Sequence, residues 1–242
     1  LDMLLEPEAV VTPADAAALR ARLEARWAGL SEHEARLNAL RRFKRREMLR
    51  IAAADVLAAH EGDRLAQQLT LLAETCVRAA LELAIAEAQA RGDLVGEPQF
   101  AVIGLGKVGG RELLYSSDLD LVLVCDLPEG DAREQYDRAY QRLAELFQEA
   151  MTRLLPDGDL YPIDLRLRPE GKGGDLIPSL DACRRYYAGR AQTWERQAML
   201  KARLLAGDAR VGEAFLAIIG PFAYPTDPSP ALADEVRAMK QR

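Results

Sequence analysis

The first part of the chain repeats apolar residues at helical spacing among charged ones. Ala, Leu, Arg and Glu dominate from Ala16 to Leu30, after Thr12-Pro13-Ala14-Asp15, which is typical of a helix start. Ser31-Glu32-His33-Glu34 has the spacing of a capping box and precedes a second long run. A third run, from about Asp63 to Arg91, keeps its leucines near one stripe. The pattern predicts a helical region over residues 1–96.

The middle of the chain changes to strand periodicity. Two short apolar runs, 100–104 and 119–125, predict buried strands. A helix is expected over 132–155, followed by a turn. Apolar and polar residues then alternate over 160–167, which predicts a strand with one polar face. We therefore expect a mixed α/β core over residues 97–178.

Helical periodicity returns in residues 179–242. Helices are predicted over 180–188, 194–204, 209–219 and 232–242. The last of these reaches the end of the chain without a cap signal, so we expect a fragment of a longer tandem protein. The fold class predicted from all three regions is α+β, with a small sheet between N-terminal and C-terminal helical bundles.

Composition and charge exclude several classes of function. Hydrophobic content of 49% and charged content of 29% are ordinary for a globular protein. A net charge of -6 argues against a general nucleic-acid binder, which carries a basic excess. No apolar run is long enough to cross a membrane, and the three cysteines form no C-x-x-C pair, so we expect a cytoplasmic protein with reduced thiols. With two histidines, a His-rich zinc site is not expected.

The strongest chemical signal is an Asp-x-Asp pair at the start of the second predicted strand. In an extended strand, Asp118 and Asp120 point to the same face, about 6–7 Å apart. Asp164 falls on the polar face of the strand predicted over 160–167. Clusters of this kind hold Mg²⁺ in nucleotidyl transfer, so we interpret the three aspartates as catalytic metal ligands. An isolated Asp-x-Asp is more often a cap or a solvated strand end, but the third carboxylate and the glycine-rich segment upstream favour the metal site.

That glycine-rich segment follows the first predicted strand. It contains residues expected to cradle phosphates through backbone N–H groups and one lysine: Gly104, Gly106, Lys107, Gly109 and Gly110. A dinucleotide-binding fingerprint is excluded because no long helix follows, and a Walker A loop is excluded because no Ser or Thr follows the lysine as required. The alternative is a tight turn that merely needs glycine.

Several other polar residues are candidates for the same site. Ser116 and Ser117 have no nearby histidine, so we expect them to donate to a phosphate or to the turn and not to act as nucleophiles. Four basic residues are assigned as phosphate contacts: Arg166, Arg168, Lys172 and Lys201. The two arginines share the predicted strand face with Asp164, so pairing with carboxylates is the equal alternative. Lys201 is placed on the helix predicted over 194–204, whose Trp194 we expect in the core.

One basic run falls outside this scheme. Arg41-Arg42-Phe43-Lys44-Arg45-Arg46 has the composition of a nucleic-acid patch. It lies inside a predicted helix of a chain with net negative charge. A solvated helix face or a site for a protein partner is therefore the favoured interpretation.

The combined motifs resemble a known family. The segments Gly104–Gly110, Ser116–Val124, Asp164–Gly174 and Thr193–Asp208, with the helical segment Leu40–Ala54, are similar to the glutamine synthetase adenylyltransferase/adenylyl-removing enzyme family, within the polymerase-β-type nucleotidyltransferase superfamily. The resemblance implies two tandem nucleotidyltransferase halves in the whole protein, of which this chain is long enough for one. It also implies that Asp118, Asp120 and Asp164 are the metal triad, with Mg²⁺, two ions in all, as cofactor.

The resemblance further implies substrates and partners. One half of such proteins removes AMP from a tyrosine of glutamine synthetase with phosphate, releasing ADP, and the other attaches AMP from ATP. Ser116-Ser117-Asp118 is more similar to the removing half. A PII-type regulatory protein is the expected further partner, and neither a membrane nor a nucleic acid is expected. The adenylylating half, a catalytically idle nucleotide-sensing module, and an enzyme acting on another acceptor stay open as alternatives.

Overall fold

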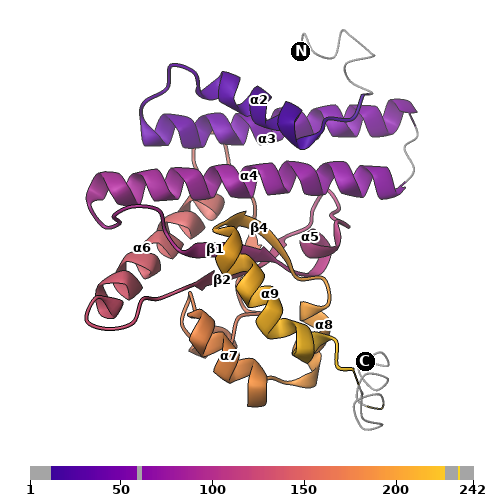
Figure 1. Cartoon of the computed structure of the whole chain (residues 1–242). Coiled ribbons are helices and arrows are strands. Elements are labelled where there is room, and N and C mark those ends of the chain that lie inside the picture. The colour runs from indigo at the N-terminus through magenta and orange to yellow at the C-terminus, as the bar shows by residue number, and fades with distance from the viewer. Residues whose placement is uncertain (1–11, 59–61, 227–233, 235–242) are drawn as a thin grey trace.

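The computed structural model describes residues 12–58, 62–226 and 234. Helices on both sides of a small mixed sheet make up this part of the chain (Figure 1), which confirms the predicted α+β class. The helix predicted over 232–242 lies outside the described residues, apart from residue 234. No helix in the described ranges is long and apolar enough to span a bilayer.

Three helices form the N-terminal layer, as predicted: α2 (Ala16–Trp27), α3 (His33–Ala58) and α4 (Gly62–Arg91). The side chain of Asp15 caps α2 by accepting a hydrogen bond from the backbone N–H of Ala18 at 2.8 Å. Helix α4 packs against α3 on one side and against the rest of the chain on the other. It therefore joins the N-terminal layer to the sheet.

The sheet has the strand order β3-β2-β1-β4. Strands β1 (Phe100–Gly104) and β2 (Leu119–Cys125) coincide with the two predicted apolar runs and pair antiparallel. Strand β4 (Arg203–Gly207) pairs antiparallel with β1, and β3 (Ile163–Asp164) pairs parallel with β2. Because β1 and β2 are central and covered on both faces, nearly every one of their residues is buried.

Each face of the sheet has its own hydrophobic cluster. Alternate residues of the central strands, such as Val102 and Leu121, join the cluster under α4 and α6 (Arg133–Thr152). The residues between them, such as Ile103 and Val122, join a second cluster under α7 (Leu180–Gly189), α8 (Thr193–Met199) and α9 (Ala209–Ala223). Figure 1 shows these two helical layers on opposite sides of the strands. The period of two along each strand thus distributes its side chains between the layers.

Two predicted elements at the sheet margins are wrong. The strand expected over 160–167 is reduced to Ile163–Asp164, because the chain turns immediately afterwards. The helix expected over 194–204 ends at Met199, and the chain continues into β4. Leu204 and Leu205 have helix-forming character, yet as strand neighbours they enter opposite clusters, and β1 gains a partner. Trp194, expected in the core, is 48% exposed.

Candidate active site

Asp118 and Asp120 flank the first residue of β2. Leu119 between them is buried, whereas Asp118 is exposed and Asp120 is half-buried. The backbone N–H of Leu105 donates to the carbonyl of Asp120 at 2.9 Å, which fixes the start of β2 against the end of β1. The central sheet therefore determines where this pair of carboxylates lies.

Asp164 completes the cluster from the neighbouring strand. It is the register partner of Asp120 across the parallel β2–β3 pair, and the N–H of Leu119 donates to the carbonyl of Pro162 at 3.0 Å. Carboxylate oxygens of Asp118, Asp120 and Asp164 lie within 4.8 Å of one another. The structure thus brings Asp164 beside an Asp-x-Asp pair that lies more than forty residues earlier in the sequence.

Arg166 is the direct cationic partner of Asp164. Its backbone N–H and its guanidinium both donate to the carboxylate, the Nε–Oδ2 distance being 2.8 Å. These bonds close a turn directly after β3, so Arg166 and Arg168 do not share a strand face with Asp164, contrary to the prediction. The carboxylate pairing that the sequence left open applies to Arg166, whose side chain is 67% exposed.

The three carboxylates differ in their electrostatic environment. Burial raises the pKa of Asp120, and the charges of Asp118 and Asp164 raise it further. The hydrogen bonds from Arg166 lower the pKa of Asp164. Crowded negative charge around one half-buried carboxylate favours a bound cation. Oxygen donors at this spacing suit the hard Mg²⁺ ion, so the residues present fit the metal that the sequence predicts.

The glycine-rich segment ends β1 and forms the short helix α5 (Gly106–Gly110), where only a turn was predicted. Gly106 has a positive φ of +49°, and a Cβ there would overlap Oδ2 of Asp120. Gly109 packs directly against the carbonyl of Lys201. Lys107 is exposed, and its charge lowers the pKa of Asp120. A Cβ at Gly104 or Gly110 would likewise meet the side chain of Leu205 or of Lys201. Close packing therefore accounts for all four glycines, and Gly106 is the one that contacts the acidic cluster.

The remaining predicted residues are divided between the cluster and its surroundings. Ser117 accepts a hydrogen bond from the N–H of Leu114 at 3.1 Å and closes a turn, and Ser116 is exposed beside it. Arg168 donates to the carbonyls of Leu165, Gly174 and Asp175, and so holds its own loop together. Lys201 pairs with Glu112 at 2.6 Å.

A groove of about 500 Å³ adjoins the acidic cluster. Five of the residues predicted from the sequence line it: Asp118, Asp164, Arg166, Arg168 and Lys172. Gln148 and Thr152 of α6, which were not predicted, line it too. These two belong to the exposed side of a helix that was recognised only by its apolar stripe, so the sequence holds no signal for them. Negative and positive side chains therefore line the same groove.

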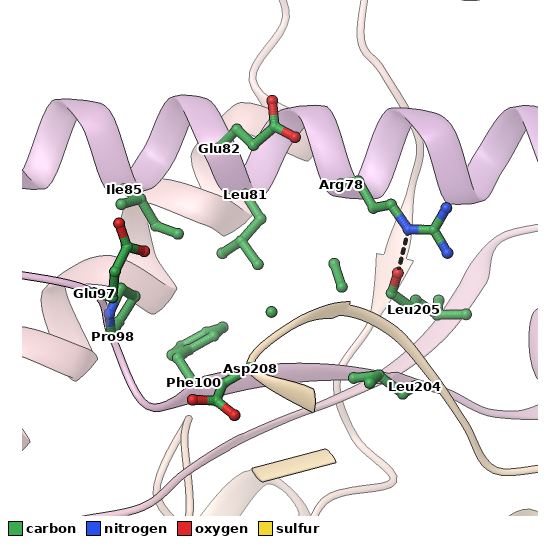
Figure 2. Close-up of a pocket in the computed structure, with 12 residues that line it drawn as sticks. Arg78, Leu81, Glu82, Ile85, Glu97, Pro98, Phe100, Leu204, Leu205 and Asp208 are labelled. Atoms are coloured by element: carbon green, nitrogen blue, oxygen red, sulfur yellow. Dashed lines mark hydrogen bonds between the residues drawn. The ribbon is translucent and has the colours of Figure 1, made fainter. Parts of the chain in front are cut away.

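A second cavity, of about 490 Å³, lies between α4 and β4. Figure 2 shows Leu81 and Ile85 pointing from α4 toward Phe100, whereas Glu82 points away. Arg78 in its wall donates to the carbonyl of Leu205 at 2.8 Å. Asp208 is engaged as the N-cap of α9. The walls of this cavity are mainly apolar, and Arg78 and Asp208 already have hydrogen-bond partners. The cavity therefore lacks the converging charges of the acidic cluster.

A mixed sheet between helical layers, with an Asp-x-Asp pair opening one strand and a third aspartate on its parallel neighbour, is consistent with a nucleotidyltransferase-type fold. Residues 1–218 match the family model described as glutamate-ammonia ligase adenylyltransferase, and the chain belongs to this family. The resemblance drawn from the sequence is thereby confirmed.

Three curated relatives are named bifunctional glutamine synthetase adenylyltransferase/adenylyl-removing enzyme. The Chromobacterium violaceum protein is 38% identical over 100% of this chain and 26% of its own length. The Nitrosococcus oceani protein is 40% identical over 86% of this chain and 23% of its own length. The Thioalkalivibrio sulfidiphilus protein is 34% identical over 100% of this chain and 27% of its own length. The chain spans about a quarter of the length of these relatives.

Proposed function

We propose that this chain is a Mg²⁺-dependent nucleotidyltransferase unit that removes AMP from an adenylylated tyrosine of glutamine synthetase by phosphorolysis. The observation that carries the proposal is the cluster of Asp118, Asp120 and Asp164, with carboxylate oxygens within 4.8 Å of one another. Family membership and the names of the relatives support the substrate. Ser116-Ser117-Asp118 supports removal over attachment.

In the proposed reaction, an oxygen of inorganic phosphate attacks the phosphorus of the tyrosine-bound AMP. A new P–O–P bond forms, the bond between that phosphorus and the tyrosine oxygen breaks, and ADP leaves. The freed tyrosine oxygen takes up a proton to restore the hydroxyl. Mg²⁺ held by the three aspartates would neutralise charge that builds up on the phosphate oxygens.

The chain's own cations have separate roles in this proposal. The exposed side chain of Arg166 lies at the groove edge. Its guanidinium can bind a phosphate oxygen as well as it binds Asp164. Lys172 lines the same groove, and Lys107 lies near enough to Asp120 for its charge to lower that residue's pKa. We propose that these three residues orient the attacking and transferred phosphates. Arg168 lines the groove as well, but its guanidinium is bonded to carbonyls of its own loop, so we propose that it and Lys201 act mainly by holding their loops in place.

The test is incubation with adenylylated glutamine synthetase, Mg²⁺ and phosphate, with ADP release as the readout. We expect ADP to form with this chain and not with the Asp120→Asn variant. A parallel reaction contains unmodified glutamine synthetase and ATP. AMP incorporation there, without ADP in the first reaction, would assign the chain to attachment. Metal-dependent nucleotide binding with no turnover in either reaction would identify a sensing module.

We also propose that a PII-type regulatory protein acts on the whole protein of which this chain represents one part. Regions 1–96, 97–178 and 179–242 remain our proposed division of the chain. Titration of the full-length protein with such a regulator, with ADP release as the readout, tests the first of these two proposals. An unchanged rate at saturating regulator would contradict it.

A further inference from the structure

Asp164 depends on a short strand for its position. Strand β3 pairs with β2 at only two residues, Ile163 and Asp164. A segment of irregular structure, residues 153–162, connects α6 to this strand and is called here the α6–β3 connection. Whatever fixes this connection also fixes the third carboxylate.

We propose that the basic face of α3 is the positioning element for Asp164, and that Arg41 is its principal residue. This proposal rests on the proposed function, because it concerns the geometry of the same metal site. Arg41, Arg42, Lys44 and Arg45 form what we call the α3 clamp. The sequence pattern favoured a solvated face or a partner site for this run, and its contacts lie instead within the chain.

Arg41 binds both ends of a turn. Its guanidinium is fully buried and donates to the carbonyl of Gly158 at 2.7 Å, to that of Arg153 at 2.8 Å and to that of Ala150 at 3.1 Å. Two of these acceptors end α6, where a cation is favoured by the helix dipole. The third lies beyond the turn. One rigid, planar side chain thus holds the end of α6 and the connection together.

The rest of the clamp holds the connection on its outer side. Arg42 and Arg45 donate to separate oxygens of the Asp157 carboxylate, which is mostly buried. The ammonium of Lys44 lies 4.5 Å from the ring centroid of Tyr161. Tyr161 is three residues before Asp164, so a shift of the clamped segment is carried directly into β3.

Arg50 provides a matched control in the same helix. It is also buried, but it donates to Glu47 and Gln68 and to the carbonyl of Thr12, away from the α6–β3 connection. Arg41→Lys and Arg50→Lys each keep the charge and lose the planar fork. Both are expected to lower the Tm. Only Arg41→Lys is expected to disturb the metal site.

The experiment measures Mn²⁺ affinity of the chain by EPR titration, well below the Tm of both variants. Hydrogen–deuterium exchange of peptides covering 158–166 is measured in parallel. We expect Arg41→Lys to weaken Mn²⁺ binding about tenfold, as loss of support around metal ligands does, and to speed exchange in those peptides. Arg50→Lys should match wild type in both measurements. Equal Mn²⁺ affinities for the two variants would overturn the positioning role.

Three further variants keep the result unambiguous. Asp120→Asn tests the metal site itself: if it binds Mn²⁺ as wild type does, the proposed function fails, whatever the clamp variants do. If Arg41→Lys does not fold, the double variant Arg42→Gln/Arg45→Gln tests the positioning role instead. It should still fold, because both side chains are more than half exposed. Its Mn²⁺ affinity should fall, whereas Arg138→Gln, which breaks an exposed pair with Glu134, should leave it unchanged. An unchanged affinity in the double variant would then overturn the proposal.

Discussion

Asp120 and Asp164 face each other across neighbouring strands, but the two strands are built differently. Strand β2 is seven residues long, central and buried on both faces, so the sheet itself fixes Asp120. Strand β3 is two residues long and half-buried, and side chains of α3 bind the segment before it. One carboxylate of the cluster therefore starts a strand held in the core, whereas the other follows a segment held by polar contacts.

The largest expected effect is on activity. Asp120→Asn and Asp164→Asn should each lower ADP release by about 10³-fold or more, since metal-ion stabilisation amounts to several kcal/mol. Their stabilities should differ. The raised pKa of Asp120 means that its ionised form opposes folding, and that this contribution worsens as pH rises through the range between the unfolded and folded pKa values.

The electrostatic contribution of Asp164 to stability has the opposite sign. Its pKa is lowered by Arg166, so its ionised form favours folding, and that contribution is lost as pH falls toward the folded pKa. In metal-free buffer at neutral pH, Asp120→Asn should leave the Tm unchanged or higher, and Asp164→Asn should lower it slightly. Calorimetry of both variants, with wild type as control, measures this. The reverse order of Tm values would contradict the electrostatic difference.

The second effect is on core stability. Leu121 in β2 is fully buried, so Leu121→Ala should cost about 2–5 kcal/mol in the free energy of unfolding. Ile163 in β3 is half-buried, and Ile163→Ala should cost about half as much. Urea unfolding of both variants checks the comparison. A larger loss at Ile163 would show that β3 belongs to the core as fully as β2 does.

The third effect tests the contact between α5 and β2. Gly106→Ala should cost about 1 kcal/mol for its positive φ and should also displace the Asp120 carboxylate, which weakens Mn²⁺ binding. Gly130→Ala is the matched control: its φ is +85°, and nothing lies within 4 Å of the added Cβ. Both variants should lose similar stability by urea unfolding. If both also keep wild-type Mn²⁺ affinity, Gly106 has no role at the carboxylate.

The smallest expected change in stability is at Arg166. Its ion pair with Asp164 is largely exposed on the arginine side, so Arg166→Gln should leave the free energy of unfolding almost unchanged. The KM for phosphate should rise about tenfold if the guanidinium binds that anion. Steady-state kinetics with phosphate varied is the measurement. Arg138→Gln, on the exposed side of α6, serves as the control with unchanged KM.

The sequence predicted the central strands well. The bounds of β1 and β2 match the apolar runs because residues buried on both faces must be apolar throughout. Asp118 and Asp120 were predicted as candidates for the same reason, since carboxylates stand out at the start of such a run. Asp164 was placed on a neighbouring strand correctly, although that strand is much shorter than its alternating pattern implied.

The sheet margins and the α3 clamp could not be predicted in the same way. Strand β4 consists mostly of residues that favour a helix, and it forms because β1 offers an open edge for pairing. The sequence pattern assigns Arg41 to a charged helix face. Its burial depends on carbonyls more than a hundred residues later in the chain, such as that of Ala150. Local patterns contain no information about which distant carbonyls will need a donor.

The division of the central strands between two hydrophobic clusters has a consequence for folding. Val102 and Ile103 are chain neighbours, yet one belongs to the cluster under α4 and the other to the cluster under α9. Neither helical layer can separate from the sheet without exposing apolar residues that hold the strands in register for the other layer. The two layers should therefore gain and lose order as one cooperative unit, and the acidic cluster should form only when both are in place.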